Sequence, residues 1–181
     1  MEAHEERFRN PIVKLVYDAI KSYLEFKTRI SPPRVYYKLL EGKSPCYVAL
    51  FKNGQLRAMY GAPEIKEVTL GVEIVTNSIG AAVKEPGKPP VTLTELEELE
   101  ICVYVLEKPR ECTRETLDPA EFGLIVEQGE KRGVMLPGWP GVASVDKQIE
   151  AAAKKGGIDV GAEFKLYKFR ATRFDRKSML T

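Results

Sequence analysis

The hydrophobic positions along the chain follow a helical period in some stretches and a two-residue period in others. Apolar residues spaced by three and four predict helices over residues 6–26 and 65–83. The second stripe is expected to face the core through Ile65, Val68, Val72, Val75, Ile79 and Ala82. A short helix is predicted after Thr94, because Glu97 completes a capping box. A last helix is expected to begin after Ser144 and end at Gly156-Gly157.

Strands are predicted where β-branched and aromatic residues gather. Residues 46–51 and 55–60 are expected to form a hairpin, because Asn53-Gly54 accepts the positive φ of a tight turn. Residues 100–106 are apolar on both faces, which indicates a central strand covered on both sides. Further strands are predicted over residues 122–126, 133–136 and 164–174. Two hairpins among interleaved helices favour an α+β fold with mixed or antiparallel sheets over a doubly wound parallel sheet.

Composition narrows the class of protein. The chain has 181 residues, 44% hydrophobic and 30% charged, which is typical of one folded domain, expected over residues 6–178. Lysine and arginine exceed aspartate and glutamate by only two, 28 against 26, which argues against nucleic-acid binding. No apolar run reaches the ~18 residues of a membrane span, and the first residues do not resemble a signal peptide. We therefore expect a cytoplasmic protein.

Cysteine and histidine usage excludes much catalytic chemistry. The three cysteines are an odd number without close pairing, as expected of reduced thiols. His4 is the single histidine, so a Ser-His-Asp or Cys-His system and a histidine-rich zinc site are not expected. No spaced acidic cluster suggests another metal site, and we predict neither a metal nor a cofactor. Sparse asparagine and glutamine beside abundant Glu, Lys and Arg is the composition of thermophile proteins.

Four segments, taken in order, carry a family resemblance. They read Lys52-Asn53-Gly54-Gln55-Leu56-Arg57-Ala58-Met59-Tyr60-Gly61, Pro89-Pro90-Val91-Thr92 with Glu95–Leu99, Leu99-Glu100-Ile101-Cys102-Val103-Tyr104-Val105-Leu106, and Gly123-Leu124-Ile125-Val126 through Arg132-Gly133-Val134-Met135-Leu136-Pro137. Their spacing resembles the AMMECR-one domain family, and Leu166-Tyr167-Lys168-Phe169 is similar to the family's closing strand. The resemblance covers nearly the whole chain.

This resemblance implies a compact α+β domain with two packed sub-regions and a cleft between them. It implies no established activity. Members of the family resemble binding partners of a Memo-type protein and of a radical S-adenosylmethionine protein. The resemblance therefore implies that these two kinds of protein are partners of this chain. The chain itself lacks the cysteine triplet of a radical iron–sulfur cluster.

The chain departs from the family pattern at two places. The family signature reads Arg-Gly-Cys-Ile-Gly, and here it is Arg57-Ala58-Met59-Tyr60-Gly61. Met59 replaces the cysteine, and a thioether has no thiolate with which to attack a substrate. The family's Arg-Asp-Pro-Arg-Phe stretch is here Lys84-Glu85-Pro86-Gly87-Lys88, which keeps one acidic and one basic residue. The chain therefore resembles a divergent member.

Six residues are candidates for a binding cleft, and each also has a structural interpretation. Arg57 and Arg132 could clamp an anion bidentately or lie in solvent on a strand. Glu100 opens a buried strand and would need a partner, which Arg57 or Arg132 could supply. Trp139, in a rigid Pro-Gly loop, could contact a ligand or cover the core. Met59 and Gly61 complete the set through the signature loop.

Cys112 is the best candidate for a reactive thiol, because Arg110 and Arg114 flank it and positive charge lowers a thiol pKa. An unreactive surface thiol is the alternative. Cys46 and Cys102 lie in predicted strands and are interpreted as small buried hydrophobes.

Two functions stay open from the sequence. The first is a binding or adaptor protein whose cleft lies near the Arg57–Gly61 loop, favoured by the scarcity of histidine and by Met59. The second is an enzyme, or an enzyme subunit, that acts with the Memo-like and radical S-adenosylmethionine proteins. In that case Arg57 and Glu100 would orient a substrate and transfer its proton.

Overall fold

The computed structural model describes residues 9–33 and 38–178, and its elements fall into two units. The first unit runs up to Val105 and takes in the stretch from Thr172 onward, and the second unit is Leu106–Ala171. The helices and antiparallel sheets confirm the α+β class. The predicted domain extent of 6–178 stays a prediction. Residues 6–8 of that range and the single histidine, His4, lie outside the described part of the chain.

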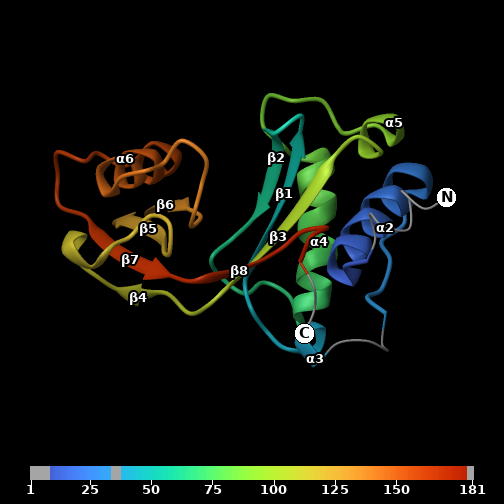
Figure 1. Ribbon diagram of the computed structural model, residues 1–181, viewed down its shortest axis with the longest axis horizontal. Helices are drawn as coiled ribbons and strands as arrows, with labels where there is room; N and C mark the ends of the chain where they lie inside the picture. The colour runs from blue at the N-terminus through green and yellow to red at the C-terminus, as the bar shows by residue number, and fades with distance from the viewer. Residues whose placement is uncertain (1–8, 34–37, 179–181) are drawn as a thin grey trace. The chain divides into compact units, whose positions relative to one another are not determined.

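The first unit is a four-stranded sheet with helices on one face (Figure 1). The strand order is β2-β1-β3-β8, so β3 is central as predicted and β2 is an edge strand. Helix α4 packs on β1 and β2, and α2 packs on α4. The elements are α2 (Pro11–Phe26), α3 (Lys38–Glu41), β1 (Cys46–Lys52), β2 (Gln55–Gly61), α4 (Leu70–Val83), α5 (Leu93–Leu96), β3 (Glu100–Leu106) and β8 (Ala171–Phe174).

The second unit is a smaller sheet covered by one helix. Its strand order is β4-β7-β5-β6, and α6 packs on β5 and β6. Buried Leu124, Val126 and Met135 of the sheet meet Ile149 and Ala152 of the helix. The elements are β4 (Arg110–Glu111), a 3₁₀ turn (Arg114–Thr116), β5 (Gly123–Gln128), β6 (Lys131–Met135), α6 (Val145–Gly156) and β7 (Lys165–Phe169).

The predicted hairpin is confirmed, because Asn53 and Gly54 both adopt positive φ between β1 and β2. The Ser144 cap of α6 is also confirmed, since its side chain accepts from the Lys147 N–H. Of the three strands expected later in the chain, the two over residues 122–126 and 133–136 are present as β5 and β6. The strand expected over 164–174 is not continuous. It divides at Arg170 into β7 and β8, which belong to different sheets.

Three helix starts predicted from the pattern are wrong, because a side-chain cap sets each start: α2 and α4 begin later than predicted and α5 begins earlier. Helix α2 starts at Pro11, where the Asn10 side chain accepts from the N–H groups of Ile12 and Val13. Thr69 caps α4 in the same way. For α5 the cap is Thr92 with Glu95, two residues before the predicted pair.

The late start of α4 leaves Ile65 and Val68 49% and 69% exposed, against the prediction that both face the core. The buried Glu73 carboxylate accepts from the N–H groups of Lys66 and Glu67 at 3.0 and 2.8 Å. These donors are therefore satisfied without a helix over residues 65–69.

Candidate functional site

The candidate residues fall into both units. Arg57, Met59 and Gly61 lie on β2, and Glu100 begins β3, all in the first unit. Arg132, Trp139 and Cys112 belong to the second unit.

Arg57 occupies a bulge in the edge strand. Leu56 lies opposite Phe51 and Ala58 lies opposite Leu50, so Arg57 has no counterpart in β1. A bulge re-aims the side chain of the extra residue. Here the guanidinium lies against Glu95 of α5, with Nε donating to Oε1 at 2.6 Å and Nη2 to Oε2 at 3.2 Å. The carboxylate that Arg57 clamps bidentately is therefore one of the chain's own.

The Arg57–Glu95 pair is largely buried, with side-chain exposures of 12% and 17%. The hydrogen bond from Arg57 lowers the pKa of the Glu95 carboxyl, and the positive charge adds to the shift. Arg57 Nη2 also donates to the Pro89 carbonyl at 2.9 Å. Its Nη1 is buried and has no hydrogen-bond acceptor among the described residues. Arg57 thus joins β2 to two later segments of the chain and keeps one donor unused.

The open edge of β2 is covered by side chains of residues 84–90, which we call the edge strap. The Met59 N–H donates to Glu85 Oε2 at 3.0 Å. From the other end of the strap, Lys88 Nζ donates to the carbonyls of Arg57 at 2.7 Å and Leu56 at 3.3 Å. Figure 1 shows this connection between α4 and α5 beside the β1–β2 hairpin. A carboxylate and an ammonium group thus take positions that a neighbouring strand's backbone would occupy.

Gly61 ends β2 at a point of close backbone contact. A Cβ atom there would lie 2.3 Å from the Cys46 carbonyl oxygen and 2.8 Å from the Tyr47 Cα. Both neighbours are backbone atoms of β1 and cannot move aside without shifting the strand. Gly61 therefore has a structural reason to lack a side chain.

The structure does not pair Glu100 with Arg57, one of the two partners expected for it. Strand β1 lies between β2 and β3, which sets Arg57 two strands away from Glu100, about 10 Å. Arg57 pairs with Glu95, and the Arg132 Nε pairs with Glu127 at 2.6 Å. Glu100 itself is exposed to solvent. Its carboxylate is therefore not desolvated and does not need the charged partner that was expected for a buried position.

The prediction of a low pKa for Cys112 is wrong. Partial burial raises the pKa of this thiol, and the charge of Lys168 opposes the shift only in part. The side chain packs against the core of the second unit. Burial also raises the pKa of Cys46, to about 12, and both Cys46 and Cys102 are buried in strands.

Trp139 packs against the core of the second unit, with the Lys155 ammonium 5.3 Å from its ring centre. It also lines a hollow of about 340 Å³ beside Asp118 and Pro119.

The described residues contain no cluster of three or more His, Cys, Asp or Glu side chains that could hold a metal ion. None of the described helices is both long enough and apolar enough to cross a membrane.

Sequence reasoning missed Glu95, Glu85 and Lys88 as partners of the signature strand. A signal for one of them was present. Glu85 is the acidic residue kept in the stretch that departs from the family pattern, whereas Lys88 stands at the position of the family's aromatic residue. Both anchor the edge strap on β2.

Comparison with known proteins agrees with this architecture. The AMMECR1 family model matches residues 13–179. The chain belongs to the AMMECR1 family. A protein of Thermotoga maritima is 33% identical over 91% of this chain and 97% of its own length. The uncharacterised protein PH0010 of Pyrococcus horikoshii, in a crystal structure, has a TM-score of 0.81 and 28% identity, covering 91% of this chain and 89% of that one.

Protein CA_C1420 of Clostridium acetobutylicum is 34% identical over 91% of this AMMECR1-family chain. The chain spans 36% of the length of that relative. None of these names states an activity.

Proposed function

We propose that this AMMECR1-family protein is a binding component that docks an extended segment of a partner protein on the open edge of β2, beside Arg57–Gly61. One observation carries the proposal. The outward backbone groups of this edge strand are held by two charged side chains of a loop, not by another strand. Glu85 and Lys88 make three hydrogen bonds to the backbone of β2, fewer than the regular ladder of a paired strand would make.

Strand addition is a known way for a sheet edge to bind a peptide, with main-chain hydrogen bonds supplying affinity. The Met59 N–H and the Arg57 carbonyl face outward and are the groups a partner strand would use. Arg57 Nη1, which has no acceptor in the described part of the chain, offers a further donor. A partner carbonyl could satisfy it when the edge strap moves.

The strap is suited to displacement. It contains Pro86, Gly87, Pro89 and Pro90, and the chain from Pro86 to Pro90 is exposed. Its proline residues keep it from forming a central strand itself. Because Glu85 and Lys88 bind through their side chains, they can leave the edge without unfolding the sheet.

The family resemblance makes a Memo-type protein the first partner to test, followed by a radical S-adenosylmethionine protein. The affinity of the full chain for each purified protein is measured by calorimetry. Glu85→Ala/Lys88→Ala removes the side-chain hydrogen bonds that hold the outward backbone groups of β2, and we expect it to tighten binding by about tenfold, or 1.4 kcal/mol. The matched control is Lys52→Ala/Glu98→Ala, which deletes an ion pair of 3.0 Å that does not touch the β2 edge.

Hydrogen exchange locates the contact. We expect the partner to protect the Met59 amide in the Glu85→Ala/Lys88→Ala variant, where Glu85 no longer holds it. If neither protein binds, the adaptor proposal fails. If a partner binds with equal affinity to wild type and to the strap variant, and leaves the Met59 amide unprotected, the protein binds elsewhere and the edge proposal fails.

A further inference from the structure

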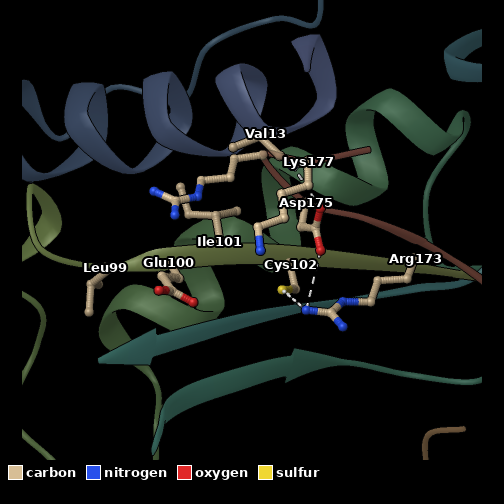
Figure 2. Close-up of a pocket in the computed structure, with 9 residues that line it drawn as sticks. Val13, Leu99, Glu100, Ile101, Cys102, Arg173, Asp175 and Lys177 are labelled. Atoms are coloured by element: carbon tan, nitrogen blue, oxygen red, sulfur yellow. Dashed lines mark hydrogen bonds and ion pairs between the residues drawn. The ribbon is translucent and has the colours of Figure 1, made fainter. Parts of the chain in front are cut away.

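A second set of charged side chains surrounds a pocket of about 320 Å³ in the first unit, between β3, α2 and the C-terminal segment (Figure 2). Val13 and Ile101 supply apolar wall, and both are nearly fully buried. Arg173, Arg176 and Lys177 supply positive charge. The volume is at the lower end of the range for small-molecule sites, about 300–1,000 Å³.

The segment that carries the cations is held in place by a turn. Asp175 Oδ1 accepts from the N–H groups of Lys177 and Ser178, at 2.9 and 3.0 Å, and from the Ser178 hydroxyl. The Ser178 carbonyl in turn accepts from the Asn10 side chain at 3.0 Å, which ties the turn to the start of α2. The pocket wall is therefore built by hydrogen bonds and not by free surface side chains alone.

The charges of the pocket do not balance. Asp175 is compensated by Arg173, whose Nη2 lies 3.3 Å from Oδ2. Arg176 and Lys177 have no ion-pair partner within the described residues, and Glu100 is the remaining carboxylate. Figure 2 shows Lys177 pointing from the C-terminal segment toward β3. Three cations against two carboxylates leave the pocket with a net positive charge.

The thiol of Cys102 adds no negative charge at neutral pH. Its sulfur accepts from Arg173 Nη2 at 3.3 Å, while burial raises its pKa. A neutral thiol does not repel an anion, and it is a poor nucleophile. The pocket is therefore arranged for binding rather than for attack by Cys102.

We propose that this pocket binds a small organic anion, a carboxylate or a phosphate monoester with a short apolar body. The anionic group would bind to Lys177 and Arg176, and the apolar part would lie against Val13 and Ile101. Carboxylates and phosphates share the recognition by guanidinium and ammonium groups. This inference is independent of the β2 edge, and neither depends on the other.

The test uses calorimetry of the full chain at low salt with hexanoate, hexyl phosphate and uncharged 1-hexanol as probes. We expect at least one of the two anions to bind saturably with a Kd below about 1 mM, and hexanol to bind at least tenfold more weakly. The anion that binds more tightly identifies the carboxylate or the phosphate class. Lys177→Gln/Arg176→Gln is expected to weaken anion binding at least tenfold.

Lys21→Gln is the control, since it removes one charge from an exposed position on α2 that does not line the pocket. Lys177 and Arg176 are exposed, so their replacement should leave the circular dichroism spectrum unchanged. Lys177→Gln alone serves if the double variant does not fold. The proposal is overturned if neither anion binds, if hexanol binds as tightly as the anions, or if the variants at Lys177 and Arg176 bind like the wild type.

Discussion

The Arg57–Glu95 pair should stabilise the first unit, and a double-mutant cycle measures by how much. Arg57→Met keeps a long side chain but removes two hydrogen bonds to Glu95 and one to Pro89. Loss of one partner of such a charged pair costs about 1.5–3 kcal/mol in all, because the hydrogen bonds are not additive and the Glu95 side chain keeps 17% exposure to water in the intact pair. The unmet Nη1 donor disappears as well, which offsets part of the loss.

We expect Arg57→Met to lower the free energy of unfolding by about 2–3 kcal/mol and Glu95→Gln by about 1–2 kcal/mol. The double variant should lose about 1.5 kcal/mol less than the sum, because each single variant already breaks the pair. Urea unfolding followed by circular dichroism at 222 nm reports mainly the first unit, whose helices α2 and α4 have 16 and 14 residues against 12 for α6 of the second unit. A coupling energy below about 0.5 kcal/mol would refute the reasoning.

The pH dependence gives the same pair a second test. The pKa of Glu95 is lowered in the folded state from its ordinary 4.5, so its stabilisation is complete above that value and is lost as the pH falls through the folded pKa. The stability difference between wild type and Glu95→Gln should therefore be constant near neutral pH and shrink below about pH 4. A difference that stays the same down to pH 3 would contradict the assignment.

Two further predictions concern the second unit. Gly133→Ala should destabilise it by about 1–3 kcal/mol, because the new Cβ would lie 1.7 Å from the Ala152 carbonyl oxygen of α6. Trp139, the single tryptophan, reports this change as an earlier fluorescence transition in urea, and an unchanged midpoint would contradict the packing. Iodoacetamide at pH 8 should modify Cys112 in the native protein more slowly than a free thiol and leave Cys46 unmodified, as peptide mass spectrometry would show. Native Cys112 reacting faster than the unfolded chain's thiols would restore the activated-thiol prediction.

The sequence predicted elements well where local chemistry decides them. Asn53-Gly54 and Ser144 specify a turn and a cap by their own side chains and backbone freedom. The start of α4 could not be predicted from periodicity. The buried Glu73 carboxylate, six and seven residues further along the chain, accepts hydrogen bonds from the backbone N–H groups of Glu67 and Lys66. The split of residues 164–174 likewise depends on pairing with strands far away in sequence.

The contacts of Arg57 could not be predicted from the sequence. Two interpretations were open, an anion clamp or a solvent-exposed strand residue, and nothing in the local sequence says that Glu95 supplies a carboxylate. That contact requires the bulge in β2, which the register with β1 creates. Arg173, Arg176 and Lys177 come to line a common pocket only when β8 joins β3, a pairing that the local sequence does not specify.

The replacement of the signature cysteine by Met59 bears on the choice between binding and catalysis. At this position the backbone N–H donates to Glu85 of the edge strap. That bond forms with any residue other than proline, so the strap on the β2 edge does not depend on a thiol. The enzyme alternative paired Arg57 with Glu100, yet β1 separates the two and Arg57 is engaged by Glu95. A binding role through the edge strand therefore survives the substitution, whereas covalent catalysis through position 59 does not.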